Sequence, residues 1–459
     1  MQHEVKENQF LNKILVMKAT KLITVFIFIS TITFGQDNSV LLDSLFSTMS
    51  QRGQFFGNVL IAEHNEITFS NSYGFADREK KEQLNEQTLF NVGSVSKAFT
   101  AIAIVQLAEK DKLELADKVF KYLPEFPYPE ITIHHLLIHA GGLPDDYDLL
   151  KNSNWNNSKI AANKDVMLAL NEQKPDLQFT PGERSEYSNL SYMMLAEIVK
   201  QVSETDFKEY LHNHIFQPAN MIRTSIYNAE EIKQVENVAK GYLLYPFSSK
   251  YEEAIDIPEF STQYVTSGFQ GDGNVYSTTI DLFNFYKALS NNTLITEESL
   301  KNVFLKHIPA QMKGTPDFGN SFGYGWTIIN APIQVVQRGG ELAGYVSNTV
   351  WNITDERLII YLSNDYLSYT SYQNQIPYSI GNIFRQSTLQ IPKMTASVEL
   401  TKIVVMSSKE TITQKIEEIK NNPEIYQIDL QGLKFLVMKL EQIGNKEKAD
   451  LIKNSFKPE

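Results

Sequence analysis

The sequence Gly93-Ser94-Val95-Ser96-Lys97 opens an almost continuously apolar run that ends at Leu107. At this length and alanine content, the run predicts a buried helix and not a strand. Ser94 would then lie at the helix N-terminus, where free backbone N–H groups and the positive end of the helix dipole converge. Lys97 would follow one turn later on the same face of the helix.

The pair Ser94 and Lys97 has two possible roles. A lysine held against an apolar helix is desolvated, which favours its neutral amine, and a neutral amine beside a hydroxyl is a base beside a nucleophile. The alternative is a serine that caps the helix and a lysine at the surface, which is the usual meaning of Ser-x-x-Lys. The helix is very apolar for an exposed lysine. This motif alone leaves both roles open.

Strand patterns occur near both ends of the sequence. Residues 57–73 have the pattern of a strand, a turn and a second strand, which predicts a hairpin. Further strand patterns follow late in the chain, at 324–329, 333–336, 346–351 and 358–362. Together they predict an antiparallel meander whose partner hairpin lies at the other end of the sequence.

These patterns predict an α/β (α+β) protein, in which an antiparallel sheet flanked by helices is split in the sequence by an inserted all-helical domain. We expect one main domain over residues 37–393. Its α/β halves cover about 37–110 and 265–393, and its helical insert covers about 111–264.

Residues 394–459 form a separate region. Helical periodicity at 416–419 and 433–443, broken by Asn421-Asn422-Pro423, predicts a small helical hairpin. Its lysines alternate with glutamates, which is typical of a solvated helix face. We therefore expect a C-terminal helical module, and its composition leaves open whether it binds a protein partner.

Two further segments combine polar residues with glycines. In Phe179-Thr180-Pro181-Gly182-Glu183-Arg184-Ser185-Glu186-Tyr187-Ser188-Asn189, Tyr187 and Asn189 are two apart, so both side chains would point to one side of an extended loop. In Gln337-Arg338-Gly339-Gly340-Glu341-Leu342-Ala343-Gly344-Tyr345, the glycines let a substrate backbone lie close to a strand edge, and Arg338 offers a cation for a carboxylate. A capped helix start and a glycine-rich strand bend are the respective alternatives.

Composition excludes several classes of function. The chain has 459 residues and no cysteine, which excludes a disulfide framework, a thiolate zinc site, an iron–sulfur cluster and a cysteine nucleophile. The net charge of −12 and the lack of a basic cluster argue against nucleic acid as a partner. His135 and His139 are four apart and could share a helix face as zinc ligands do, but no glutamate directly follows His135. We expect no metal and no cofactor.

Residues 1–36 have the pattern of an export signal. Basic residues precede an apolar run at 22–34, and small residues follow at a plausible cleavage point. The run is short for a membrane span, which needs about 20 apolar residues. We expect a cleaved signal peptide beginning at Met1 or Met17, no stable membrane span afterwards, and a periplasmic or secreted protein. An uncleaved single-helix anchor is the alternative.

Taken in chain order, the segments around Ser94, Tyr187 and Arg338 resemble the three motifs of the serine β-lactamase and penicillin-binding-protein superfamily. The resemblance is strongest to the class C β-lactamase-like branch, which includes D-alanyl carboxypeptidases and esterases. It covers about residues 40–390. Further segments that carry it are Thr88-Leu89-Phe90-Asn91-Val92-Gly93-Ser94, Leu136-Leu137-Ile138-His139-Ala140-Gly141-Gly142-Leu143-Pro144, Gly271-Asp272-Gly273-Asn274-Val275-Tyr276-Ser277-Thr278, Asp281-Leu282-Phe283 and Tyr324-Gly325-Trp326.

The resemblance implies an exported serine hydrolase that forms an acyl-enzyme on Ser94 and cleaves an amide or an ester. Lys97 would be the base. Tyr187 would share proton transfer to and from the leaving group, and Asn189 would hydrogen-bond the substrate or Lys97. The substrate would be a small molecule or a peptide, and a D-alanyl peptide, a β-lactam, a D-amino-acid peptide and a simple ester all remain open.

The third motif departs from the family pattern, which has Lys-Thr-Gly or His-x-Gly where this chain has Arg338-Gly339-Gly340. Arginine keeps a cation for a substrate carboxylate but cannot relay a proton. The resemblance implies that Arg338, Gly340 and Glu341 contact the substrate, and that the N–H groups of Ser94 and Glu341 form the oxyanion hole. With nucleophile and base intact, we favour an active enzyme over a catalytically weak or inactive binding protein on the same fold.

Overall fold

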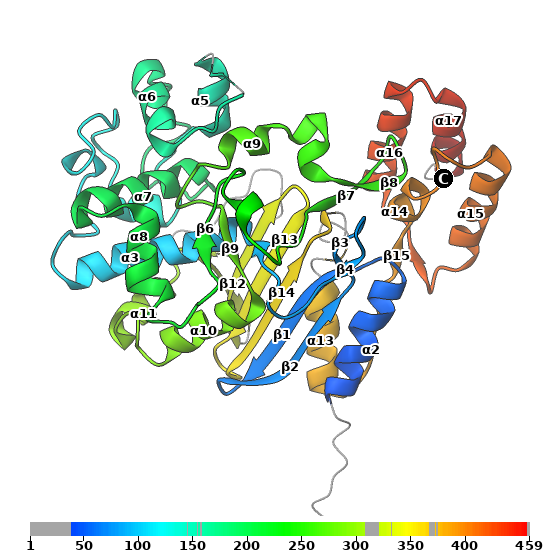
Figure 1. The fold of residues 1–459 in the computed structure, drawn as a ribbon, viewed down its shortest axis with the longest axis horizontal. Helices are drawn as coiled ribbons and strands as arrows, with labels where there is room; N and C mark the ends of the chain where they lie inside the picture. The colour runs from blue at the N-terminus through cyan, green and yellow to red at the C-terminus, as the bar shows by residue number, and fades with distance from the viewer. Residues whose placement is uncertain are drawn as a thin grey trace, which may run out of the picture.

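The computed structural model describes residues 38–144, 146–153, 155–156, 158–307, 321–331, 333–366, 372 and 375–456. The expected signal peptide lies outside the described residues. Within them, seven strands form an antiparallel sheet in the order β10-β11-β12-β13-β14-β1-β2 (Figure 1). In chain order these strands are β1 (Gly57–Glu63), β2 (Glu66–Tyr73), β10 (Ser321–Phe322), β11 (Thr327–Ala331), β12 (Ile333–Leu342), β13 (Tyr345–Asn352) and β14 (Arg357–Ser363).

The sheet joins the two ends of the main domain. Strand β1 pairs antiparallel with β14, in a register that runs from Gly57 opposite Ser363 to Glu63 opposite Arg357. The expected N-terminal hairpin and late meander are therefore both present and form one sheet, which confirms the mixed α/β class. One difference concerns β12, which continues to Leu342, so that Arg338-Gly339-Gly340 lies inside a strand and not after one.

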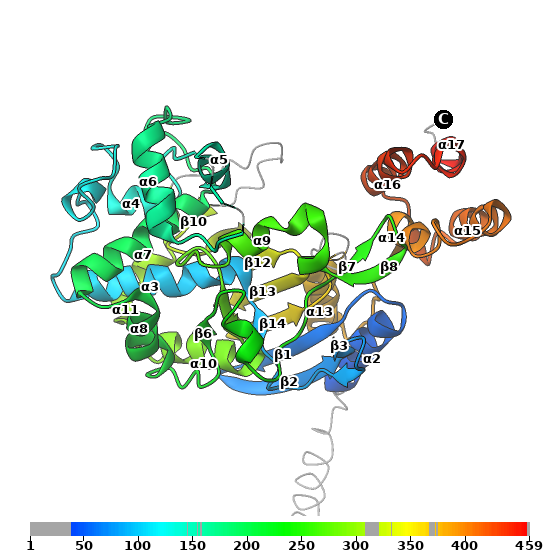
Figure 2. The same cartoon turned by 45° about the horizontal axis from the view of Figure 1, so that its top comes forward.

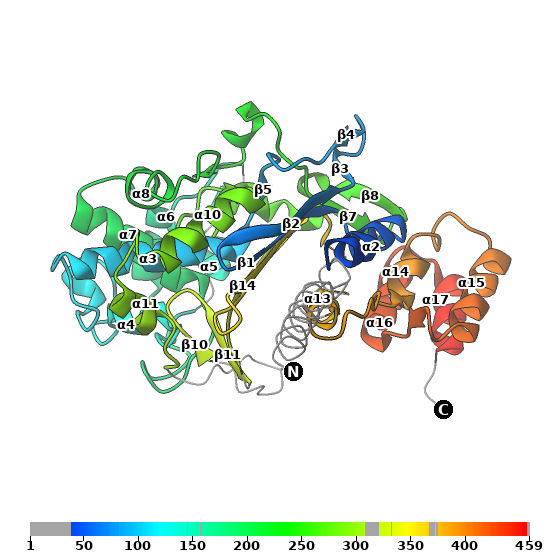
Figure 3. The same cartoon turned by 90° about the horizontal axis from the view of Figure 1, so that it is seen from below.

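Helices cover both faces of the sheet (Figure 3). Alternate residues of a strand point to opposite faces, and β1 buries both sets. Val59 and Ile61 pack with the helices α2 (Asn38–Gln51) and α13 (Gln375–Gln386). Leu60 and Ala62 join the larger core on the other face, which contains the helices α3 (Ser96–Glu109) and α10 (Thr279–Ser290).

Helix α3 confirms the helix expected after Ser94. Every residue from Ser96 to Leu107 is buried, because α7 and α8 pack against α3 (Figure 2) and the core that contains α3 continues to the sheet. The helices of that region are α4 (Ile133–Leu137), α5 (Asp146–Asn152), α6 (Asn163–Gln173), α7 (Asn189–Ser203), α8 (Phe207–Leu211) and α9 (Thr262–Thr266), and α11 (Glu297–Val303) follows α10.

The middle region is not all-helical, in contrast to our expectation. It contains the strands β6 (Ser225–Ile226), β7 (Tyr242–Tyr245) and β8 (Lys250–Glu253). Outside the large sheet the chain also forms β3 (Phe75–Asp77), β4 (Glu82–Gln83), β5 (Phe90–Asn91) and β9 (Val275–Ser277), and β9 pairs with both β5 and β6. Strands of two to four residues are too short to show a period of two, and pairing with distant segments stabilises them.

The C-terminal region has its own hydrophobic core. The described residues there form the helices α14 (Ala396–Thr401), α15 (Lys409–Asn421), α16 (Leu430–Gln442) and α17 (Lys446–Ser455), and a parallel pair of short strands, β15 (Met394–Thr395) and β16 (Tyr426–Gln427). The helices predicted at 416–419 and 433–443 are confirmed, although they belong to a larger set than one hairpin.

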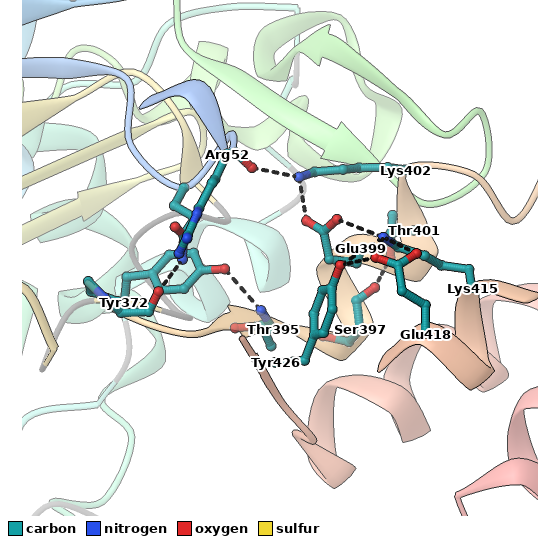
Figure 4. A network of polar contacts seen from close by, with 12 residues as sticks. Arg52, Tyr372, Thr395, Ser397, Glu399, Thr401, Lys402, Lys415, Glu418 and Tyr426 are labelled. Carbon is teal, nitrogen blue, oxygen red and sulfur yellow. Dashed lines mark hydrogen bonds and ion pairs between the residues drawn. The ribbon is translucent and has the colours of Figure 1, made fainter. Parts of the chain in front are cut away.

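Polar contacts attach this module to the end of α2 (Figure 4). The Nζ of Lys402 donates to the carbonyl oxygen of Arg52 (3.2 Å) and forms an ion pair with Glu399 (2.5 Å). The backbone N–H of Thr395 donates to the Tyr372 hydroxyl (3.1 Å).

Among the described residues, no helix combines the length and the apolar character that a membrane span requires.

Candidate active site

Ser94 lies in a 3₁₀ turn, Gly93–Val95, that runs directly into α3. Gly93 begins the turn with a φ of +49°, which side-chain-bearing residues rarely adopt, and a Cβ at this position would lie 2.8 Å from the backbone nitrogen of Glu341. The side-chain amide oxygen of Asn91 accepts a hydrogen bond from the Gly93 N–H (2.9 Å) and stabilises the turn. The local sequence therefore holds the nucleophile candidate tightly against β12.

Lys97 follows one turn later and is fully buried. Its Nζ donates to the hydroxyl oxygen of Ser94 (3.2 Å), the side-chain oxygen of Asn189 (2.8 Å) and the backbone carbonyl of Asp272 (2.8 Å). An ammonium group has three hydrogens, and each of them finds an acceptor. The surface-lysine alternative is therefore wrong. The Nζ of Lys97 is thus directed at Ser94, Asn189 and the Asp272 carbonyl.

Tyr187 faces the same hydroxyl. The Ser94 Oγ and the Tyr187 phenolic oxygen are 2.6 Å apart, and the Lys97 Nζ lies 4.9 Å from the centre of the tyrosine ring. Burial raises the pKa of Tyr187, but the positive charges of Lys97 and Arg338 and the hydrogen bonds from Lys97 and Ser94 outweigh burial, so that the net pKa lies below the usual 10.0. Although 37% of the residue is exposed, the hydroxyl is surrounded by cations and donors.

His139 determines where Tyr187 lies. The backbone N–H groups of Glu186 and Ser188, on either side of Tyr187, donate to the carbonyl oxygen and the Nδ1 of His139. The imidazole packs on the tyrosine ring, with centroids 4.7 Å apart. Burial, together with the charges of Arg338 and Lys97, lowers the pKa of His139 well below its usual value, so this histidine is neutral.

The positions of His135 and His139 exclude the zinc-ligand pair on one helix face that the sequence suggested. Helix α4 ends at Leu137, and His139 lies beyond it with a φ of +57°, so His135 and His139 share no helix face. The Nδ1 of His135 instead accepts the Thr132 N–H and caps α4 (3.4 Å). In the part of the chain that is described, no group of three or more His, Asp or Glu side chains is placed to hold a metal ion.

Asn189 is the first residue of α7, and Ser188 is the N-cap. The side-chain oxygen of Asn189 accepts from Lys97, and this turns its NH₂ group away from the lysine. Tyr187 and Asn189 thus face one site, as their spacing predicted, although a capped helix start is present as well.

Arg338 differs from the expectation. It is only 4% exposed, and two of its donors have partners in the protein: Nε donates to the Ser94 carbonyl (2.8 Å) and one terminal nitrogen to the Tyr187 hydroxyl (2.8 Å). Inside β12 the arginine therefore points at the nucleophile and the tyrosine. A buried guanidinium with these partners supports Tyr187 and is poorly placed to capture a substrate carboxylate.

Gly340 lets β12 approach the nucleophile. A Cβ at this position would lie 2.1 Å from the Val92 carbonyl oxygen and 2.8 Å from the Ser94 backbone nitrogen, distances that no side chain tolerates. The backbone of Gly340 and Glu341 thus lies against the turn that carries Ser94, and a Cβ on Gly93 would lie 2.8 Å from the Glu341 nitrogen. An oxyanion hole needs two N–H donors close to the reacting carbonyl, and that Ser94 and Glu341 supply them stays a prediction.

Known proteins resemble this chain in sequence and in fold. A family model described as Beta-lactamase matches residues 42–377 of the chain. The chain belongs to the beta-lactamase family. Penicillin-binding protein 4* of Bacillus subtilis (strain 168) is 34% identical over 358 residues, which are 77% of this chain and 78% of that protein. The putative penicillin-binding protein PbpX of the same organism is 29% identical over 314 residues, 68% of this chain and 71% of that protein.

Solved structures agree with this assignment. A penicillin binding protein from Bacillus halodurans superposes with a TM-score of 0.63 at 25% identity, covering 72% of this chain and 98% of that one. A D-amino acid amidase from Ochrobactrum anthropi SV3 has a TM-score of 0.64 at 19% identity, covering 77% of this chain and 99% of that one, and shows the common fold. This beta-lactamase-family chain is thus a member of the serine β-lactamase and penicillin-binding-protein superfamily, whose members include serine hydrolases.

Asp272 is a site residue to which sequence reasoning gave no role. Its backbone carbonyl accepts from Lys97, and a carbonyl has no signature in the side-chain pattern. Burial raises the pKa of its carboxyl, while the charge of Lys97 acts in the opposite direction. The motif around 271–278 was visible in the sequence, but only the fold brings it to Lys97.

Proposed function

We propose that the protein is an exported serine hydrolase that forms an acyl-enzyme on Ser94 and cleaves an amide or an ester. The observation that carries this proposal is the 2.6 Å contact between the Ser94 hydroxyl and Tyr187, whose pKa is lowered beside two buried cations. A hydroxyl paired with an activated base is the requirement for nucleophilic catalysis.

In the first step Tyr187, as the phenolate, takes the proton of Ser94 while the Ser94 Oγ attacks the substrate carbonyl. The carbonyl oxygen becomes an oxyanion between the N–H groups of Ser94 and Glu341. When the tetrahedral intermediate collapses, Tyr187 returns the proton to the leaving amine or alcohol, and the acyl group stays on Ser94.

Hydrolysis of the acyl-enzyme repeats these steps with water in place of Ser94. Tyr187 takes a proton from water, the resulting hydroxide attacks the ester carbon, and the proton returns to Ser94 Oγ as the ester bond breaks. Lys97 stays protonated on its three acceptors and stabilises the phenolate. This division of roles assigns the base to Tyr187, whereas the sequence suggested Lys97.

The alternative is a catalytically weak or inactive binding protein on the same fold, and Arg338 is the feature that favours it. The arginine does not interrupt the proton path outlined above, because no proton passes through it. We therefore favour the active enzyme over the binding protein. Its proposed substrates are amides or esters, in line with the penicillin-binding proteins and the amidase that share the fold.

A direct test combines labelling with a panel of substrates. The purified protein is treated with a fluorophosphonate probe and, separately, with a labelled penicillin, a chromogenic β-lactam, a D-alanyl peptide, a D-amino-acid amide and a p-nitrophenyl ester. We expect a covalent adduct and turnover of at least one amide or ester. Protein that is folded, unlabelled and inactive on the whole panel would overturn the proposal in favour of the binding protein.

The pH profile tests the role of Arg338. Phenolate is the active form of Tyr187, so kcat/KM rises with pH as Tyr187 loses its proton. Arg338→Met removes one of the charges that lower this pKa, so the ascending limb of the pH–rate profile moves to higher pH by about one unit or more. Measuring kcat/KM for a p-nitrophenyl ester between pH 5 and 10 gives this shift.

Arg357→Met is a matched control. Arg357 is a partly buried arginine in the same sheet, but it pairs with Glu63 on β1. Its loss leaves the pH profile in place. An unchanged profile in Arg338→Met would show that Arg338 does not act on the base.

A further inference from the structure

The two cations of the site, Lys97 and Arg338, are buried and have uncharged partners. The Nζ of Lys97 donates to a hydroxyl, a side-chain amide oxygen and a backbone carbonyl. Arg338 donates to a backbone carbonyl and to the Tyr187 hydroxyl. Moving a cation out of water costs free energy that neutral acceptors offset only in part. A negative charge near these cations would therefore stabilise the site.

Asp272 brings a carboxyl group to this place. Its backbone carbonyl oxygen is 2.8 Å from the Nζ of Lys97. The carboxyl group belongs to the same residue, so bond lengths alone keep its oxygens within about 8 Å of that nitrogen. Opposite charges at this separation attract each other more strongly inside a protein than in water. Burial raises the pKa of the Asp272 carboxyl, and the charge of Lys97 opposes this rise.

The loop that carries Asp272 is fixed against two helices. The carbonyl oxygen of Gly271 accepts a hydrogen bond from the Thr100 hydroxyl on α3 (2.7 Å). Gly271 has a φ of +98°, and a Cβ on it would lie 2.3 Å from the carbonyl oxygen of Tyr192 on α7. The Asp272 carboxyl is therefore kept close to the Lys97 side chain.

Hydrogen bonds that hold the fold together do not account for this carboxyl. Its Oδ1 is buried and has no hydrogen-bond partner among the described residues, and the donors that act on the carboxyl are backbone N–H groups of its own loop, at 272 and 273. Asp429 in the C-terminal module is the opposite case, because its two carboxyl oxygens accept from the N–H and the hydroxyl of Ser397. A buried carboxyl oxygen without a donor costs free energy, and for Asp272 a nearby cation offsets this cost.

We propose that the carboxylate of Asp272 is the counter-ion of Lys97 and that it limits, through Lys97, the positive field at Tyr187. Asp272 is a positioning residue and takes no proton in the cycle outlined above. The proposal rests on the proposed function and adds to it the group that sets the working pH range of the site. With the carboxylate in place, the phenolate of Tyr187 stays basic enough to take the proton of Ser94.

Asp272→Asn tests the proposal through the pH profile. The variant keeps the backbone carbonyl that accepts from Lys97 and nearly the same side-chain shape, and it removes the negative charge. The two cations then act on Tyr187 unopposed, so we expect the ascending limb of kcat/KM for a p-nitrophenyl ester to move to lower pH by about half a unit or more. The plateau falls, because a less basic phenolate takes a proton more slowly. This shift is opposite in direction to that of Arg338→Met.

A second variant and a control separate this role from a structural one. Asp272→Ala also removes the charge but adds no amide, and the same shift to lower pH is expected for it. Asp429→Asn is the matched control, since burial raises the pKa of the Asp429 carboxyl as well, but this residue lies in the C-terminal module. Its pH profile stays at the parent position. Thermal unfolding of each protein shows that it is folded.

Two results would overturn the proposal. If folded Asp272→Asn and Asp272→Ala kept the ascending limb of the parent, or moved it to higher pH, the counter-ion would be refuted while the proposed function stayed intact. If the parent protein hydrolysed no ester and took no fluorophosphonate label, both would be refuted.

Discussion

Replacing Ser94 by alanine abolishes covalent labelling by a fluorophosphonate and lowers kcat/KM for ester hydrolysis by about 10³-fold or more. The reason is that Ser94 provides the only atom on which the acyl group is carried in the proposed cycle. Tyr187, Lys97 and the oxyanion-hole amides remain in Ser94→Ala, so a small residual rate can come from water activated by Tyr187 and from binding alone. Intact-mass measurement after labelling and initial rates with a p-nitrophenyl ester give the two results.

The sequence offers a matched control two residues away. Ser96 is buried in the first turn of α3, and its hydroxyl accepts the N–H of Val275 (3.3 Å). Ser96→Ala removes a serine from the same motif without touching the proposed proton path, so the adduct persists. Labelling that survives in Ser94→Ala, or that disappears in Ser96→Ala while the protein stays folded, would show that the adduct forms elsewhere.

The parts of the site that the sequence predicted are those whose geometry is local. Ser94 and Lys97 are one helical turn apart, so their contact follows from the helix alone. The apolar character of α3 identified that helix, and the alternating strand patterns identified the sheet. Each of these features is encoded within about 15 neighbouring residues, which is why the fold class was readable.

The role of Arg338 required the tertiary structure. From the sequence alone we expected Arg338 to follow a strand and to offer its charge to a substrate carboxylate. The longer β12 buries Arg338 and directs it to Ser94 and Tyr187, and nothing near position 338 specifies those partners. The contact of Lys97 with the Asp272 carbonyl joins residues 175 positions apart, and the short strands of the middle region depend on distant partners in the same way.

Replacing Lys97 by methionine lowers kcat/KM by about 10²- to 10⁴-fold. Methionine has nearly the same length and shape, so the change removes the charge and the three hydrogen bonds while the packing around α3 is largely kept. Without the ammonium, the side-chain oxygen of Asn189 and the carbonyl of Asp272 lose their donor, and the pKa of Tyr187 rises because its largest stabilising charge is gone. Less of the tyrosine is then phenolate at neutral pH, and the remaining activity shifts to higher pH.

Rates and pH profiles with a p-nitrophenyl ester, together with thermal unfolding, separate this role from a structural one. Lys402→Met is the matched control, since Lys402 is a largely buried lysine with hydrogen bonds to Glu399 and Arg52, but it belongs to the C-terminal module. Lys97→Met unfolds cooperatively like the parent and loses activity, and Lys402→Met keeps its activity. If kcat/KM of Lys97→Met for the ester were within threefold of the parent value, the lysine would only stabilise the packing of α3. The lowered pKa of Tyr187 would then depend on Arg338 alone. The pH profile of Arg338→Met shows which cation stabilises the phenolate. Loss of a cation moves the ascending limb of the pH–rate profile to higher pH only if that cation stabilises the phenolate.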